Sequence, residues 1–189
     1  MNSISTQNYS TLLEEAVLFH GHVCGGIESG TRMAISGLQR IGISDPKGTD
    51  RKKLIVFVEI DRCATDAIMS VTGCRPGKRT MKIVDYGKMA ATFINLESGK
   101  AVRLVSKGRK NSNDSDEMPN YTTATDEELF SISEVEVPLL PEDLPGSPVR
   151  TALCASCGEK ILDGRETEHL GETFCRPCHT SSRYYVPLS

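Results

Sequence analysis

Apolar residues recur at helical spacing in two segments near the start of the chain. Residues 11–18 (TLLEEAVL) are rich in helix formers and place their apolar side chains on one side, which predicts a helix ending near His20. Gly21 is a plausible stop, because glycine tolerates the left-handed conformation beyond a helix end. A second helix is predicted over residues 27–41, and the glycine pair at 25–26 allows a tight turn before it.

The middle of the chain changes to the pattern of strands. Residues 53–60 (KLIVFVEI) form a nearly continuous apolar run, which is typical of a buried strand, and residues 64–71 then predict a helix. Residues 107–125 form a polar loop, and Thr125 begins a capping-box pattern for a short helix. Further strands are predicted over residues 80–86, 88–95 (joined to the preceding one at Gly87), 100–106 and 131–137.

Prolines divide the chain near its end. Residues 138–148 hold four prolines and a glycine, which is typical of a stiff linker. We therefore expect an α+β domain over residues 1–147 and a small module over residues 148–189. A chain of 189 residues allows this division into one ordinary domain and one small module.

Composition and charge narrow the class of protein. Hydrophobic residues make up 38% of the chain and charged residues 25%, which is typical of a soluble globular protein. The net charge of −3 disfavours nucleic acid as a partner. No apolar run is long enough to cross a bilayer, and the first residues lack the apolar core of a signal peptide. We expect a cytoplasmic protein with no membrane partner.

Four of the seven cysteines form two C-x-x-C pairs in the C-terminal module. Cys154 and Cys157 make the first pair and Cys175 and Cys178 the second, a spacing typical of a zinc site. A four-thiolate site is closed and structural, and in so small a module the metal supplies much of the folding energy. A redox dithiol is the alternative, and His179, beside Cys178, is a candidate replacement ligand.

A second cluster of ligand types lies in the segment FHGHVC. His20, His22 and Cys24 are suited to zinc or another transition metal, and the same groups could act as nucleophile and base. In an extended segment the three side chains would share one face, whereas a helix running through His20 would turn that residue away. At a helix N-terminus, Cys24 would have a lowered pKa.

Cys63 follows the predicted central strand and is the expected third ligand, from the strand's carboxyl end. The candidate catalytic residues are therefore Cys24, His22 and Cys63, and the candidate ligands are these three with His20. Cys74 is a weaker candidate that could be a packed turn residue. Several charged residues are possible auxiliaries: Glu28, Asp61 and Asp66 could orient a histidine, and Lys78 and Lys88 could bind an anionic substrate.

Four ordered motifs in the first two-thirds of the chain carry a resemblance to a known family. They are FHGHxCxGxxxGxR from Phe19, RCAxDAI from Arg62, TGCxxGK from Thr72 and DYGKxAxTF from Asp85. Together they resemble the FmdE family of formylmethanofuran dehydrogenase subunits. Many members have proline where this chain has Gly25, and Arg79-Thr80 replaces a segment that usually contains glycine.

The resemblance implies a thioredoxin-like core, with a mixed sheet flanked by helices, and a C-terminal zinc finger of the treble-clef or zinc-ribbon type. It also implies a homodimer and an open metal site at His20, His22, Cys24 and Cys63, with zinc as the expected metal at both sites. The implied role is that of an accessory subunit or maturation partner of a molybdenum or tungsten formylmethanofuran dehydrogenase-like enzyme of one-carbon metabolism. The alternatives are a stand-alone metal- or thiol-dependent enzyme and a zinc-finger interaction or regulatory protein.

Overall fold

The computed structural model describes residues 6–108 and 120–186, and the chain divides into two compact units, Met1–Val137 and Pro138–Ser189. The division falls at the beginning of the proline-rich segment, which includes the 3-10 turn η2 (Pro141–Asp143). The sequence pattern predicted a boundary at the end of that segment, after residue 147.

A five-stranded mixed sheet forms the centre of the first unit. Its order is β2-β1-β3-β4-β5, with β2 parallel to β1 and every other neighbouring pair antiparallel. The expected α+β class with a mixed sheet is confirmed. β2 and β3 do not pair with each other, since β1 lies between them. The strands are β1 (Leu54–Val58), β2 (Met81–Ile83), β3 (Ala90–Asn95), β4 (Ala101–Ser106) and β5 (Phe130–Glu134).

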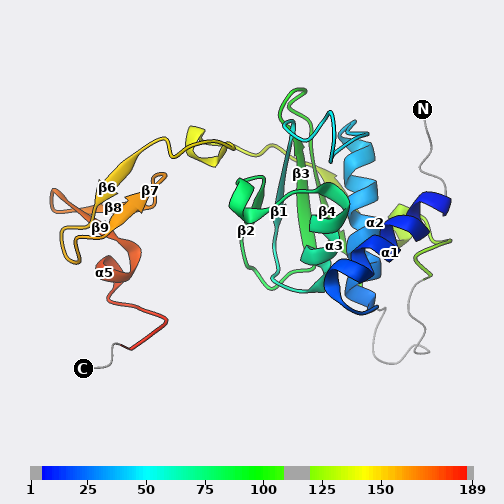
Figure 1. Cartoon of the computed structure of the whole chain (residues 1–189), viewed down its shortest axis with the longest axis horizontal. Helices are drawn as coiled ribbons and strands as arrows, with labels where there is room; N and C mark the ends of the chain where they lie inside the picture. Colours follow the sequence, from blue (N-terminus) through cyan, green and yellow to red (C-terminus); the bar gives the residue numbers. More distant parts are fainter. Residues whose placement is uncertain (1–5, 109–119, 187–189) are drawn as a thin grey trace. The chain divides into compact units, whose positions relative to one another are not determined.

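Three helices gather on one side of this sheet (Figure 1). Val56, Phe93 and Val102 are register partners across β1, β3 and β4, and their side chains share one core with apolar residues of the three helices. Both helices predicted early in the chain are confirmed, although the first begins several residues before the expected start. The helical elements are α1 (Thr6–His20), α2 (Gly25–Arg40), α3 (Cys63–Thr72), the 3-10 turn η1 (Pro76–Lys78) and the short α4 (Asp126–Leu129).

The backbones of α2 and α3 approach each other closely at Gly30. A methyl group on Gly30 would lie 2.6 Å from the carbonyl oxygen of Ala64 and 2.7 Å from its Cα. Gly26, one turn earlier, faces the same helix, because a methyl group there would lie 3.0 Å from Cβ of Cys63. The two glycines therefore let the N-terminal ends of α2 and α3 lie side by side.

The loop after β1 is held by a pair of opposite charges and by backbone hydrogen bonds. Arg103 of β4 donates to both carboxylate oxygens of Glu59, at 2.6 and 2.7 Å, and this contact lowers the pKa of Glu59. The carbonyl of Glu59 also accepts from the N–H groups of Tyr86 and Lys88. Thr65 then closes the start of α3 by donating its hydroxyl to the carbonyl of Ile60 at 2.6 Å. Cys63 lies between Glu59 and Thr65, and the contacts of these two residues hold the backbone on either side of it.

The capping box predicted at Thr125 is confirmed. Its hydroxyl accepts from the N–H of Glu128, and the Glu128 carboxylate accepts from the N–H of Thr125 at 2.8 Å. Most of the loop predicted over residues 107–125 lies outside the described residues, at positions 109–119. Within the described part of the chain, none of the helices combines the length and apolar composition that a membrane span requires.

In the described part of the second unit, two short hairpins and a helix follow the proline-rich segment. β6 (Thr151–Leu153) pairs with β7 (Lys160–Leu162), and β8 (Glu166–His169) pairs with β9 (Glu172–Cys175), both antiparallel. The helix α5 (Arg176–Thr180) follows directly. Few of the apolar side chains described in this unit are buried, which fits a zinc-ribbon module stabilised by metal.

The approach at Gly30 predicts a strong effect of side-chain size at this position. Gly30→Val should lower the free energy of unfolding by about 1–3 kcal/mol, because the new side chain would push against the backbone of α3. Urea unfolding followed by circular dichroism measures the change. Gly77→Val is the matched control, since a methyl group there has nothing within 4 Å. Equal stabilities of the two variants would contradict the close approach.

Candidate metal centres

Three helix ends meet at one point in the first unit. His20 is the last residue of α1, Cys24 is the N-cap of α2, and Cys63 is the first residue of α3. Their potential ligand atoms, one imidazole nitrogen and two sulfurs, all lie within 4.8 Å of one another. The three side chains come from two segments some forty residues apart, so the fold and not the local motif completes the cluster.

The turn between α1 and α2 explains how two of these residues meet. Gly21 has a φ of +102°, and its N–H donates to the carbonyl of Val17 at 2.7 Å, which ends α1. Cys24 is extended, and its carbonyl accepts from the N–H groups of Ile27 and Glu28 at the start of α2. The expected glycine stop and the position of Cys24 at a helix N-terminus are both confirmed.

Asp66 fixes the orientation of the His20 ring. Nδ1 of His20 lies 2.8 Å from Oδ2 of Asp66, one turn into α3, and donates its proton to that carboxylate. In this tautomer Nε2 carries the lone pair. Nε2 is buried and has no hydrogen-bond partner. Its lone pair is therefore available to a metal ion. A histidine that donates one nitrogen to a carboxylate and offers the other to an ion is a common arrangement in metal sites.

His22 lies outside the cluster. Its ring is exposed, and its centroid is 4.6 Å from that of His20. From the sequence, either an extended segment would place both histidines on one face, or a helix through His20 would turn His20 away. The helix does run through His20, yet His20 is the residue that joins the cluster, because the positive φ of Gly21 redirects the chain after it. His22 could reach an ion here only after its side chain moves.

The two thiols lie at the positive ends of two helices. Such ends favour the binding of an anion. Burial and the neighbouring Cys24 thiol raise the pKa of Cys63 above the ordinary value for a cysteine. A cation placed between them would reverse this effect, since it stabilises both thiolates. The set of one imidazole and two sulfurs suits zinc and leaves a fourth position for another ligand.

The other predicted auxiliaries do not join the cluster of ligand atoms. Cys74 is buried, in agreement with a packed turn residue, and burial raises its pKa. Asp61 and Lys78 are exposed, and the ammonium group of Lys88 lies 5.6 Å above the ring of Tyr86. Of the three carboxylates considered as orienting groups, the structure places Asp66 against a histidine.

The contribution of Gly26 and Gly30 was not predicted from the sequence. A signal was present, because Gly26, Gly30 and Ala34 are spaced four residues apart and therefore lie on one face of a helix. A stripe of small residues on a helix permits close approach of a neighbouring element. This stripe of small residues would have predicted that the start of the second helix packs closely against the backbone of a neighbouring element.

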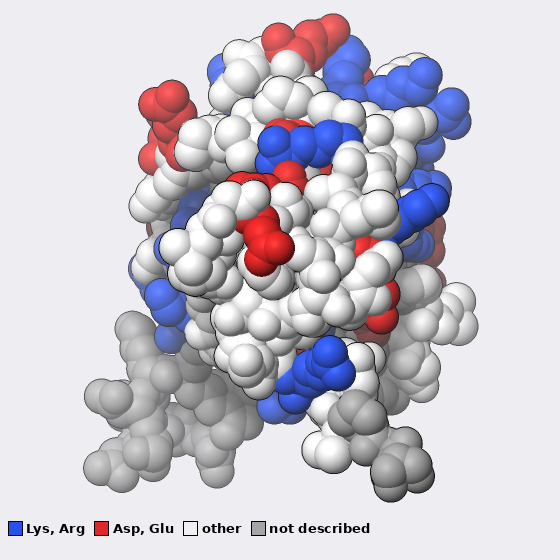
Figure 2. Space-filling view, turned by 90° about the vertical axis from the view of Figure 1, so that its left-hand side faces the viewer, with Lys and Arg blue, Asp and Glu red and all other residues white. Residues whose placement is uncertain are grey.

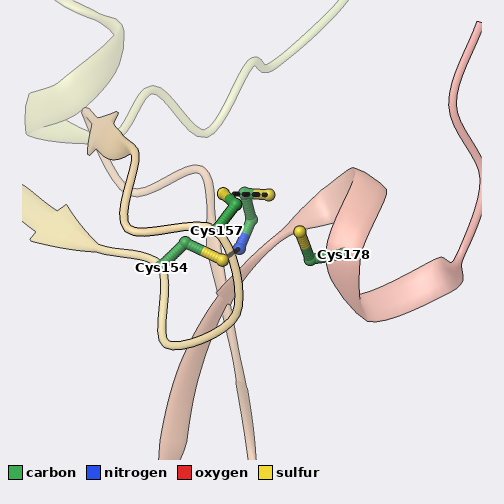
Figure 3. Close-up of side chains that lie close together, drawn as sticks. Cys154, Cys157 and Cys178 are labelled. Carbon is green, nitrogen blue, oxygen red and sulfur yellow. Dashed lines mark hydrogen bonds between the residues drawn. The ribbon is translucent and has the colours of Figure 1, made fainter. Parts of the chain in front are cut away.

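The second cluster lies in the C-terminal unit, where Figure 3 shows the sulfurs turned toward a common centre. The sulfurs of Cys154, Cys157, Cys175 and Cys178 all lie within 4.8 Å of one another. Cys154 and Cys157 flank the turn after β6, whereas Cys175 and Cys178 lie at the end of β9 and in α5. The N–H of Cys175 donates to the sulfur of Cys154 at 3.3 Å. The structure thus brings both C-x-x-C pairs to one potential four-sulfur site.

The thiols of this cluster differ in acidity. Backbone N–H groups, first that of Cys157 and then that of Cys175, lower the pKa of Cys154 to about 6. For Cys157, the N–H of Glu159 favours the thiolate, but burial and the surrounding sulfurs prevail and raise the pKa to about 12. Four thiolates so close together repel one another, and a bound cation would remove that repulsion.

The charged residues of the C-terminal unit are of both signs, with Lys160, Arg165, Arg176 and Arg183 among Glu159, Glu166, Glu168 and Glu172. In the face shown in Figure 2, uncharged residues predominate, and basic and acidic side chains lie scattered among them. This face is unlike the continuous basic surface of a dedicated nucleic-acid-binding module. His169 and His179 are exposed, with ring centroids 5.3 Å apart, and neither belongs to the four-sulfur cluster.

The contact between His20 and Asp66 predicts a role for Asp66 in metal affinity. Asp66→Asn should weaken Co²⁺ binding at the first cluster by about 10–100-fold, because the His20 ring loses its charged orienting partner. Titration with Co²⁺, followed by the absorption of the thiolate complex, measures the affinity. Asp61→Asn removes an exposed carboxylate two residues before Cys63 and serves as the control. Equal losses in the two variants would contradict an orienting role.

Metal removal should affect the two units differently. A strong chelator should unfold the C-terminal module, because the module buries little apolar surface and its folding depends on the ion. The first unit should keep its sheet and its apolar core. Limited proteolysis with mass spectrometry checks this, with new cleavage expected beyond residue 150. Cys157→Ser should reproduce the effect without a chelator, and a module that resists proteolysis in both cases would contradict the prediction.

Two comparisons place the chain among known proteins. It is similar to a solved structure of an FmdE-like protein from Syntrophus aciditrophicus, named after tungsten formylmethanofuran dehydrogenase, with a TM-score of 0.59 and 19% identity, over 98% of this chain and 100% of that one. This likeness concerns the fold. A "probable S-adenosyl-L-methionine-binding protein" of Archaeoglobus fulgidus is 32% identical over 94 residues, which are 49% of this chain and 26% of the relative. The chain therefore spans about a quarter of that relative's length.

The family model described as "FmdE, Molybdenum formylmethanofuran dehydrogenase operon" matches residues 19–136. The match covers more than half of the chain and ends one residue before the end of the first compact unit, Met1–Val137. It includes all three residues of the first cluster, His20, Cys24 and Cys63. The protein therefore belongs to the FmdE family.

Proposed function

We propose that the protein binds zinc through His20, Cys24 and Cys63 and acts as an accessory subunit or maturation partner of a molybdenum or tungsten enzyme of one-carbon metabolism. The observation that carries the proposal is the buried Nε2 of His20. This atom has no hydrogen-bond partner and belongs to a ring held by Asp66, and His20 offers a ring nitrogen within 4.8 Å of both sulfurs. A nitrogen left in this state would cost free energy unless a ligand used it.

The donor set fits a zinc ion with one position left for another ligand. A bound zinc ion would supply Lewis acidity and would lower the pKa of a coordinated water molecule. The chain contributes the orientation of His20 through Asp66, and it places Cys24 and Cys63 at the starts of two neighbouring helices. The exposed ring of His22, beside His20, could exchange protons with a ligand at the fourth position.

The family supports the accessory role. Its description refers to the molybdenum formylmethanofuran dehydrogenase operon, and the similar solved structure is named after the tungsten enzyme. A cytoplasmic homodimer that contacts such an enzyme is part of the proposal. The four-sulfur cluster would hold a structural zinc ion, and its small module would supply a contact surface.

A stand-alone metal- or thiol-dependent enzyme acting on a small substrate is the second candidate. The favouring observation is that the sulfur-bearing residues Cys24 and Cys63 are only half-buried, so that a small molecule could reach them. In that case the same three side chains would act on a substrate in the absence of a larger enzyme.

The metal content of the purified protein tests the first part of the proposal. The wild-type chain should bind two zinc ions, one at each cluster. His20→Ala and Cys24→Ala should each retain one ion, since they affect only the first cluster. Cys74→Ala should retain both and is the control for loss of a cysteine. Inductively coupled plasma mass spectrometry gives the stoichiometry, and one ion per chain in all four proteins would contradict a metal centre at His20.

Purification from the native host tests the accessory role. A tagged chain should retain a partner that carries molybdenum or tungsten with its pterin, and the metal should scale with the amount of tagged protein. Elution as a chain free of molybdenum and tungsten, with two zinc ions bound, would contradict the accessory role. That result would favour the second candidate, because the metal centre would then work by itself.

A further inference from the structure

Cys24 and Cys63 form a pair of neighbouring free thiols. Their sulfurs lie within 4.8 Å of each other, and neither residue takes part in a disulfide. Each is only half-buried, so that a small reagent can reach it. Cys74, the third cysteine of the first unit, is only 3% exposed and does not belong to this cluster.

Gly26 keeps the space between the two thiols free of other side chains. A methyl group at this position would lie 3.0 Å from Cβ of Cys63 and 3.7 Å from Sγ of Cys24. It would therefore intrude between the residues that carry the sulfurs. Because Gly26 has no side chain, no side-chain atom at this position stands between the two cysteines.

The surrounding structure already brings the two cysteines together before any reaction. Cys24 and Cys63 begin neighbouring helices, whose backbones are in contact at Gly30 and Ala64. A disulfide needs Cα atoms within about 7 Å and a sulfur–sulfur bond of about 2 Å. Thiols held beside each other in this way reach that bond with little entropic cost, since the fold has already closed the loop between them.

We propose that Cys24 and Cys63 form a reversible disulfide, which makes this pair a redox modification site. The disulfide itself requires only the two thiols. Its competition with metal rests on the proposed function, because the same two sulfurs would be ligands of the zinc ion. The site then has two exclusive states, a reduced state that binds metal and an oxidised state that does not.

The oxidant in this proposal is a low-molecular-weight disulfide, RSSR. The thiolate of either cysteine attacks one sulfur of RSSR, which gives a mixed disulfide with the protein and releases RS⁻. The second cysteine thiolate then attacks the protein sulfur of the mixed disulfide, forms the Cys24–Cys63 bond and releases a second RS⁻. Two protein thiols are oxidised by two electrons, one external disulfide is reduced to two thiols, and the thiol protons pass to the leaving groups.

Oxidation would leave the site without its sulfur ligands. His20 and its partner Asp66 would keep their hydrogen bond, but one imidazole is too weak a ligand set to retain zinc by itself. In the other direction, bound metal would protect the thiols. With free zinc well above its dissociation constant, the small metal-free fraction should slow the cross-link at least about tenfold.

Peptide mapping tests this proposal on the full-length protein. Chelator-treated protein is incubated with glutathione disulfide, free thiols are alkylated, and the chain is digested with trypsin without reduction. The expected product joins the peptide of residues 1–32, which holds Cys24, to that of residues 63–78, which holds Cys63 and Cys74. The C-terminal cysteines fall on the separate peptides 151–160 and 166–183. Their oxidation is therefore distinguishable.

Three variants identify the partner. Cys24→Ser and Cys63→Ser should each abolish the linked peptide, whereas Cys74→Ser should retain it at the wild-type yield. Dithiothreitol should reverse the link, and zinc added before the oxidant should slow its formation at least tenfold. A circular dichroism spectrum of each variant confirms that it is folded.

Two outcomes would overturn the proposal. The first is protein in which Cys24 and Cys63 are fully alkylated, or carry glutathione, with no linked peptide. The second is a link that survives in Cys63→Ser, since Cys74 would then be the partner. Failure of the proposed function looks different. In that case the linked peptide forms, but reduced protein shows no zinc at the first cluster and zinc does not slow the reaction.

Discussion

The close packing of α2 against α3 is the constraint on which the candidate site depends. Gly30 lies against the backbone of Ala64, and Gly26 faces Cβ of Cys63. Larger residues at these positions would separate the helix ends and with them Cys24 and Cys63. The turn at Gly21 then adds His20 from the end of α1, and Asp66 of α3 orients its ring. Three contacts among the helices and the turn at Gly21 therefore define one cluster.

Much of this arrangement could be predicted from local sequence signals. The helical spacing of apolar residues placed α1 and α2, and the apolar run before Asp61 placed β1. The position of Cys63 after that strand suggested that it would join Cys24, and the structure brings the two together. These predictions succeeded because each depends on a few neighbouring residues.

Predictions that depended on geometry beyond the local pattern were less successful. Whether His20 or His22 meets Cys24 depends on the positive φ of Gly21, which the pattern of residues alone does not determine. In the sheet, β1 lies between β2 and β3, although β2 and β3 follow each other in the chain. This order depends on pairing between distant segments, and the sequence around Gly87 did not predict it. Asp66 was one of three carboxylates with equal claim, because its partner lies 46 residues away.

The two clusters differ in their ligand atoms and in the packing around them. Four sulfurs in the C-terminal module close around one point and tie together hairpins that bury little apolar surface. In the first unit, two sulfurs and one nitrogen form the cluster, and the unit has a separate core of buried apolar residues. Metal bound at His20, Cys24 and Cys63 would leave one coordination position for another ligand, and loss of that metal would leave the two thiols open to oxidation.

The most direct test of the metal centre is a crystal structure of the zinc-loaded protein with anomalous data collected at the zinc edge. The proposed zinc site predicts an anomalous peak about 2.3 Å from the sulfurs of Cys24 and Cys63 and about 2.0–2.1 Å from Nε2 of His20. A second peak should lie among the four C-terminal sulfurs. A peak at the C-terminal sulfurs with none at His20, or coordination of His20 through Nδ1 in place of Nε2, would contradict it.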